Sequence, residues 1–183
     1  MRIMAMFALS IHVAAAQCAA PDESLTETDQ AVWTSIVSGL CSKDFPTTNV
    51  VVIRANVGLV SASGPENSMD PMPDLLHRNN GRDVLPPKQL GCPGLRIASA
   101  SEVQELFSRA EHNPPTWDAF YKRFPGAKAI TFLSYPGYSS NGTNAVVETS
   151  YDCGATCGAG HIYSLKLKSG RWVVIKRETT WIS

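Results

Sequence analysis

The chain has 183 residues, carries 16 Lys and Arg against 16 Asp and Glu, and is 44% hydrophobic. A net charge of zero argues against the broad basic surface that binds nucleic acid, and the hydrophobic content is that of a folded protein with a core. Beyond the N-terminal segment no apolar stretch approaches the roughly 20 residues that span a bilayer, so we expect no membrane insertion.

The first 16 residues have the pattern of a secretory signal peptide. Arg2 is followed by an apolar run and then by the small residues Ala14–Ala16, which form a cleavage site. We therefore predict a signal peptide over residues 1–16, a single α+β domain over residues 17–183 and a secreted or periplasmic location. A buried N-terminal helix is the alternative interpretation of the same run.

A helix is predicted over residues 24–41, followed by a short buried strand over residues 49–55. Ser24 and Glu27 have the spacing of a capping box, in which each side chain accepts a hydrogen bond from the other residue's backbone N–H. Apolar residues then recur at helical spacing, and a run of β-branched residues follows after Pro46.

Residues 58–97 alternate prolines with glycines and show no sustained helical or strand period. Such a length without secondary structure is unusual inside a compact domain. We predict a long Pro/Gly-rich loop here, either a functional loop or a disordered excursion.

Two more helices are predicted after this loop. Ser99 and Glu102 repeat the capping-box spacing, and a further helix begins at Pro115. The second of these helices carries a stripe of aromatic residues, which we interpret as core rather than as a cofactor site. The stripe consists of Trp117, Phe120, Tyr121 and Phe124.

From residue 128 onward the pattern changes from helical to strand. Strands are predicted over residues 129–138, 143–151, 161–167 and 172–181, with Asn-Gly and Ser-Gly turn sequences between them. The predicted fold class is α+β, with N-terminal helices packed on a curved four-stranded antiparallel sheet formed mainly by residues 128–181.

The five cysteines indicate disulfides, because an exported chain folds in an oxidising compartment. Cys153 and Cys157 flank a short segment of small residues, so we predict a bridge between them. Cys41–Cys92 is the natural second bridge, although four cysteines allow three pairings. Cys18 is then left over.

A zinc site is the alternative for the close cysteine pair, with His161 as a third ligand. Structural zinc sites use four ligands, and the sequence has no second close pair. We therefore predict no metal, and no motif indicates a cofactor.

Tyr151, His161 and Tyr163 are the candidate ligand-binding residues. Strand alternation places His161 and Tyr163 on one face, and Tyr151 on the apolar face of the preceding strand. A histidine between two tyrosines can bind a ligand or carry a proton, and a hydrogen-bonded packing histidine is the alternative. Nucleophile, metalloprotease, phosphate-loop and dinucleotide motifs are absent from the sequence, so catalytic residues stay unknown.

The C-terminal third carries the pattern Cys153-Gly-x-x-Cys157-Gly-x-Gly160, then Gly170-x-Trp172 and Trp181-Ile-Ser183. In this it resembles a group of uncharacterised exported bacterial proteins over residues 115–183, a resemblance that implies fold and compartment and no activity. A helix followed by a curled antiparallel sheet is also similar in topology to the cystatin-like and NTF2-like folds, which include binding modules and enzymes.

The expected function is that of a non-enzymatic binding module of the bacterial envelope, such as an inhibitor, an immunity-like protein or an accessory protein. Its partner would be another envelope or secreted protein. The motif-free chain, the bridged cysteines and the long loop favour this hypothesis. The alternative is a small-molecule-binding or hydrolytic protein with an NTF2-like cavity lined by Tyr151, His161 and Tyr163.

Overall fold

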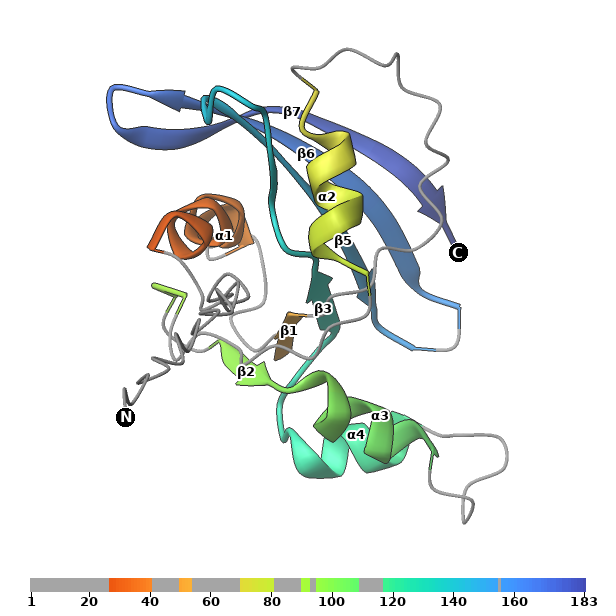
Figure 1. Cartoon of the computed structure of the whole chain (residues 1–183). Helices are drawn as coiled ribbons and strands as arrows, with labels where there is room; N and C mark the ends of the chain where they lie inside the picture. The colour runs from red at the N-terminus through yellow and green to blue at the C-terminus, as the bar shows by residue number, and fades with distance from the viewer. Residues whose placement is uncertain are drawn as a thin grey trace, which may run out of the picture.

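A computed structural model describes residues 27–40, 50–53, 70–80, 90–92, 95–108, 117–154 and 156–183. Within these ranges four helices surround one mixed sheet (Figure 1). The predicted signal peptide, Ser24, Cys18 and Cys41 lie outside the described residues.

The elements follow the chain in a mixed order of helices and strands. The helices are α1 (Glu27–Leu40), α2 (Met72–Arg78), α3 (Ala100–Ser108) and α4 (Trp117–Arg123). The strands are β1 (Val50–Ile53), β2 (Arg96–Ala98), β3 (Ile130–Leu133), β4 (Gly137–Tyr138), β5 (Asn144–Asp152), β6 (Gly158–Lys168) and β7 (Arg171–Ile182).

The sheet has the strand order β2-β1-β3-β5-β6-β7, and β4 pairs with β5 beside this path. β3, β5, β6 and β7 pair antiparallel, as predicted. β1 is parallel to both β2 and β3, which adds a short parallel part that the sequence did not indicate. The α+β class is therefore confirmed, and the sheet is larger than the four strands predicted.

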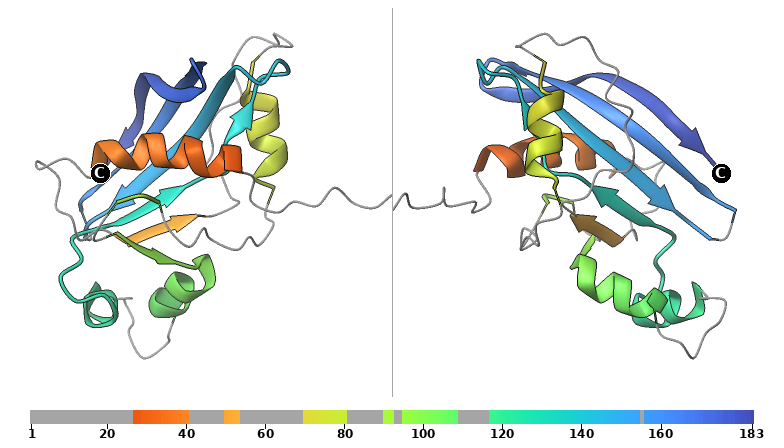
Figure 2. Two further views of the ribbon diagram at one scale, coloured as in Figure 1. Left: turned by 90° about the vertical axis from the view of Figure 1, so that its left-hand side faces the viewer. Right: turned by 45° about the vertical axis from the view of Figure 1, so that its right-hand side comes forward.

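Helices cover the two faces of the sheet at different places. The inner face, as we call it, packs against α1, whose buried residues contact Leu133, Val147 and Leu165. The outer face packs against α3 and α4, where Phe120 and Val103 bury Ile130. Figure 2 shows α1 crossing the long strands and α3 and α4 gathered at the other end of the sheet.

α1 lies against the sheet through the apolar residues that predicted it. Trp33 is fully buried, and its indole N–H donates a hydrogen bond of 2.8 Å to the carbonyl of Ser134. Ser35 donates from its hydroxyl to the carbonyl of Trp172 at 2.9 Å, so the helix is tied to both sides of the inner face.

The structure differs from the prediction in the Pro/Gly-rich segment, where α2 forms and β2 begins. α2 has only seven residues, too few for a visible period, and its Pro73 lies in the first turn, where proline is tolerated. Leu75 is fully buried. A Cβ at Gly137 would collide with the backbone of Leu75 in α2 and of Pro71, the residue before this helix, so glycine allows β4 and α2 to touch.

α3 and α4 confirm two predictions. The backbone N–H of Glu102 donates to the Ser99 hydroxyl at 3.1 Å, which is half of the expected capping box. The aromatic stripe is core, because Phe120 is fully buried and Trp117 packs edge-on against it, with ring centroids 5.3 Å apart. Tyr121 lies at the exposed border of this cluster.

The C-terminal hairpins follow the turn sequences. Ser169 and Gly170 both have positive φ, as a two-residue hairpin turn requires. Gly142 also has positive φ, and the Asn141 side chain accepts a hydrogen bond of 3.0 Å from the Thr143 N–H. The strand predicted over residues 129–138 is divided into β3 and β4 around Pro136, which cannot donate to a ladder.

A disulfide joins Cys153 to Cys157 at the turn between β5 and β6, as predicted, with their Cα atoms 5.1 Å apart. Cys92 is disulfide-bonded as well. Its expected partner, Cys41, lies in a part of the chain that the structure does not describe, so that pairing stays a prediction. Among the described helices none is long and apolar enough to cross a membrane.

Candidate functional site

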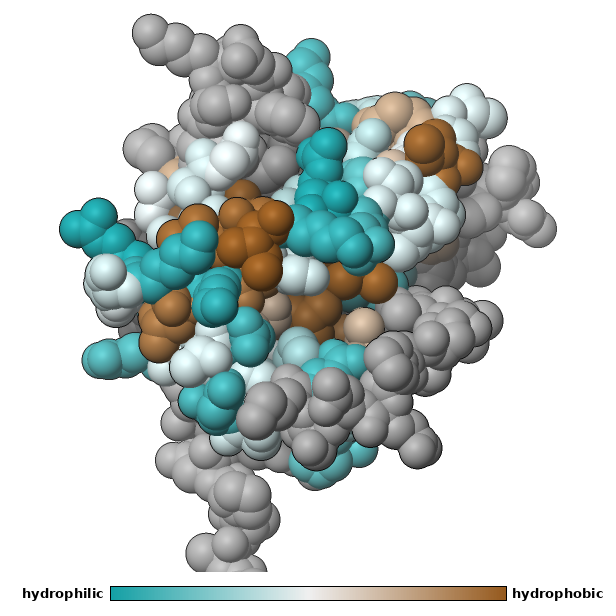
Figure 3. Space-filling model, turned by 90° about the horizontal axis from the view of Figure 1, so that it is seen from above, coloured by the Kyte–Doolittle hydropathy of each residue, from teal (hydrophilic) through white to brown (hydrophobic). Residues whose placement is uncertain are grey.

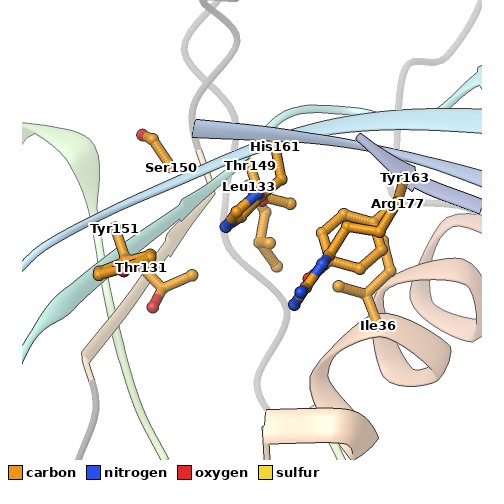
Figure 4. A pocket seen from close by; sticks show the side chains of 9 residues that line it. All are labelled: Ile36, Thr131, Leu133, Thr149, Ser150, Tyr151, His161, Tyr163 and Arg177. Carbon is orange, nitrogen blue, oxygen red and sulfur yellow. The ribbon is translucent and has the colours of Figure 1, made fainter. Parts of the chain in front are cut away.

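An open hollow lies on the inner face of the sheet beside α1. It contains about 440 Å³ of empty space, including the part that merges with the solvent. Its lining comes from one helix and four strands (Figure 4). The lining residues are Ile36, Thr131, Leu133, Thr149, Ser150, Tyr151, His161, Tyr163 and Arg177.

The structure brings all three predicted ligand-binding residues to this hollow. The β5–β6 register places His161 opposite Thr149 and Tyr163 opposite Val147, all on the inner face. The ring centroids of Tyr151 and His161 are 6.2 Å apart, and those of His161 and Tyr163 are 6.3 Å apart. The three rings therefore form one continuous aromatic row.

Arg177 is a lining residue that the sequence did not indicate. Simple alternation from the buried Trp172 would send residue 177 to the outer face. A register shift between Ser164 and Leu165 adds one residue to β7, and Arg177 then pairs with Tyr163 on the inner face. Such bulges commonly redirect a side chain. Figure 4 shows the guanidinium reaching into the hollow.

The hollow has a buried floor and an exposed border. Leu133 and Ile36 are buried aliphatic residues of the core beneath it. Tyr151, expected on the core-directed face, is 37% exposed and stands at the border. Figure 4 shows the Ser150 side chain directed away from the hollow, so Ser150 contributes backbone there.

His161 lies half-buried within the aromatic row. Burial, and then the positive charge of Arg177, hold the pKa of His161 below its ordinary value of 6.5. The imidazole is therefore neutral at neutral pH. Its Nδ1 lies 3.2 Å from the hydroxyl of Thr179, a hydrogen bond in which either group can donate.

The charge of the lining is positive. Among the lining residues that the structure describes, Arg177 is the one permanently charged side chain and none is acidic. Within the described residues Arg177 has no ion-pair partner, whereas its neighbour Lys176 pairs with Glu178 at 2.9 Å on the outer face. A free cation above an apolar floor can attract an anion.

The zinc alternative loses two of its ligands, because Cys153 and Cys157 are bonded to each other. In the described ranges no group of three or more His, Cys, Asp and Glu residues is placed to hold a metal ion.

A second polar cluster lies at the N-terminal end of α1, two turns before Ile36. Arg78 of α2 donates two hydrogen bonds, of 2.9 and 2.8 Å, to the fully buried carboxylate of Asp29. The hydroxyl of Tyr138 donates to the same carboxylate at 2.7 Å. Burial and the charge of Asp29 raise the pKa of Tyr135, beside this cluster, to about 12. The cluster is structural, because it joins α1, α2 and β4 without facing the hollow.

Comparisons with protein-family models, curated proteins and solved structures find no match to this chain. The chemistry of the hollow must therefore be inferred from its geometry. Its groups suit binding: aromatic faces, hydroxyls, a neutral imidazole and one cation. The imidazole of His161 shares a hydrogen bond with the hydroxyl of Thr179, which fixes the orientation of the ring beside the hollow.

Proposed function

We propose that this protein is an exported, non-enzymatic binding protein that takes a small ligand into the hollow beside α1. The observation that carries the proposal is the convergence of Tyr151, His161, Tyr163 and Arg177 from three different strands above a buried aliphatic floor. An apolar concave site with a few convergent polar groups is the usual form of a small-molecule site.

The binding energy would come from ring contacts and from apolar burial. An aromatic contact is worth about 0.5–1.5 kcal/mol beyond the area that it buries. The floor residues Leu133 and Ile36 are held in place by the core, so the hollow requires little rearrangement to accept a ligand. This rigidity favours binding over a site that must first be assembled.

A fragment screen followed by NMR tests this proposal. Small fragments in equal numbers of anionic, neutral and cationic members would be added to the oxidised protein, and the imidazole resonances of His161 followed. We expect a subset to shift these resonances, and we expect Tyr163→Leu to weaken that response. Tyr121→Leu on α4, which removes an exposed tyrosine that does not line the hollow, should leave it unchanged. If no fragment of any charge shifts His161, the proposal is wrong.

A second candidate function, the binding of a protein partner, is favoured by the exposed edge of the sheet. β7 is a terminal strand, and within the described residues nothing pairs with its outer edge. It exposes Val173, Ile175, Trp181 and Ile182, the last at 78%. β6 and β7 lie at the top of Figure 1, and the view from above in Figure 3 shows hydrophobic residues gathered between hydrophilic ones. Such an edge can accept an extended segment of another exported protein as an added strand.

The edge can be tested by charging it. The double variant Ile175→Lys and Ile182→Lys places lysines where strand addition would occur. Charged side chains on an edge strand oppose its pairing with another strand. A partner bound by strand addition should be lost by this variant and retained by Tyr121→Lys. Equal retention by both variants would exclude the edge as the docking surface.

A further inference from the structure

We infer that the ligand of the hollow is a small aromatic or flat apolar monocarboxylate, with its carboxylate on Arg177 and its body against the aromatic row. This inference rests on the proposed function, since it names the chemical class of the ligand that the hollow would bind. Four features of the described lining residues support it: the cation of Arg177, the absence of acidic groups among them, the apolar floor and the number of their positive charges.

The positive charge of Arg177 favours a ligand with a negative charge. Arg177 reaches the hollow through the β7 bulge and, among the residues that the structure describes, has no ion pair there. A guanidinium binds a carboxylate through two parallel hydrogen bonds, which gives both energy and orientation. Because none of the described lining residues is acidic, an entering anion meets no like charge among them.

The number of cations limits the charge of the ligand. The described part of the lining holds one arginine, and His161 is neutral at neutral pH. A phosphate monoester carries a charge near −2 and is usually bound by several donors or cations. One guanidinium matches one carboxylate, so a monoanion fits the hollow better than a phosphate.

The shape and the lining of the hollow indicate the chemical nature of the uncharged part of the ligand. Tyr151, His161 and Tyr163 present a continuous row of rings, and Leu133 closes the floor. A flat apolar body can contact these rings while the carboxylate stays near the solvent-exposed Arg177. A strongly polar body, such as a sugar, would leave its hydroxyls against aliphatic carbon.

Benzoate and benzamide form the matched pair of probes, because they have the same shape and differ in charge. The oxidised protein would be titrated with each, with the His161 imidazole resonances as the readout. We expect benzoate to bind at least tenfold more tightly than benzamide. In Arg177→Gln the affinity for benzoate should fall by roughly ten- to hundredfold, the usual range for a hydrogen bond to a charged group, while the affinity for benzamide stays the same.

Lys176→Gln is the control variant. It removes the same charge from the neighbouring residue on the opposite face, so benzoate binding should be unchanged. Far-UV circular dichroism of both variants would establish that each is folded. A pH series adds a second readout: a bound carboxylate favours the imidazolium, so benzoate affinity should rise as the pH is lowered through the pKa of His161. The groups that face this imidazole are Tyr151 from β5, Tyr163 from β6, and Arg177 and Thr179 from β7.

The outcomes separate the inference from the proposed function. If benzoate and benzamide bind equally, or if Arg177→Gln leaves benzoate binding intact, the carboxylate class is wrong although the hollow binds ligands. If phenyl phosphate, a monoester with a charge near −2, competes with benzoate at equal concentration, the limit to one negative charge is wrong. If the wider fragment screen finds no binder of any charge, the proposed function fails, and this inference fails with it.

Discussion

The imidazole of His161 is partly buried and lies beside the guanidinium of Arg177, so a positive charge on it is costly in the folded protein. Its folded pKa lies below the unfolded value of 6.5, and the unfolded chain therefore binds more protons between these two values. We predict that the contribution of His161 to the free energy of unfolding falls as the pH is lowered through about 6.5 and becomes constant below the folded pKa.

Two variants isolate this contribution. His161→Gln should show a smaller loss of stability on acidification, measured by urea unfolding at a series of pH values. Arg177→Gln should raise the pKa of His161 towards 6.5 without fully restoring it, because burial remains the larger cause. An NMR titration that gives His161 a pKa above 6.5 in the unmodified protein would contradict this account.

Gly160 allows the indole of Trp181 to lie on the outer face of β6. A Cβ at residue 160 would collide with Cδ1 and Nε1 of Trp181. Gly160→Ala should therefore lower the free energy of unfolding by about 1 kcal/mol. This value is at the lower end of the range for overpacked cores, because the half-exposed indole of Trp181 can move aside.

Gly39→Ala is the matched substitution in α1, where an added Cβ meets nothing within 4 Å. It should raise stability by about 0.5–1 kcal/mol through helix propensity. Thermal unfolding of both variants tests the pair, and an equal effect of the same sign would show that the contact with Trp181 has no influence.

At the scale of elements, the ion pair between Arg78 and Asp29 joins α2 to α1. Because the Asp29 carboxylate is fully buried, removal of its charged partner should be costly. We predict that Arg78→Met lowers the free energy of unfolding by about 3 kcal/mol, the lower end for a buried pair, since Arg78 is a quarter exposed.

The control for this variant is Arg123→Met, which removes a mostly exposed partner of Glu102 and should cost less than about 1 kcal/mol. The double variant Asp29→Asn and Arg78→Met should lose less stability than the sum of the two single variants. Strict additivity in chemical denaturation would show that the two side chains do not act as a pair.

The disulfide between Cys153 and Cys157 closes the turn that joins β5 to β6. Chain entropy predicts that a loop this short contributes about 2 kcal/mol, so Cys153→Ser with Cys157→Ser should lower stability by about that amount. Peptide mapping without reductant should recover the two cysteines as a linked peptide. Free thiols at both positions would contradict the bridge and restore the zinc alternative.

The elements that the sequence predicted are those whose signals are local. Helical spacing predicts α1, the Ser99 cap predicts α3, and the turn sequences at Asn141 and Ser169 predict the hairpins. α2 was missed, since seven residues with a proline show no period. The parallel pairing of β1 with β2 and β3 depends on contacts between distant residues, which no local pattern records.

The same division applies to the site. Alternation along β5 and β6 was enough to place Tyr151, His161 and Tyr163 on one face. Arg177 could not be predicted, because a bulge reverses the alternation of β7 between Val174 and Lys176. The residue that sets the proposed charge preference therefore became visible only when the β6–β7 register was known.

At the scale of the whole molecule, the arrangement of helices explains why a hollow exists. α1 covers the inner face around Leu133, Val147 and Leu165, while α3 and α4 cover the outer face at the other end of the sheet (Figure 2). Beside α1 the inner face keeps its aromatic row and Arg177 around an open space. The site is thus the part of the inner face that lies beside α1, the helix whose side chains form the core on this face.

The most direct test of this account is a crystal structure of the oxidised protein grown with benzoate. We expect one benzoate beside Tyr151, His161 and Tyr163, with its carboxylate on the guanidinium of Arg177. A hollow occupied by the protein's own side chains, or a benzoate bound only elsewhere on the molecule, would contradict it.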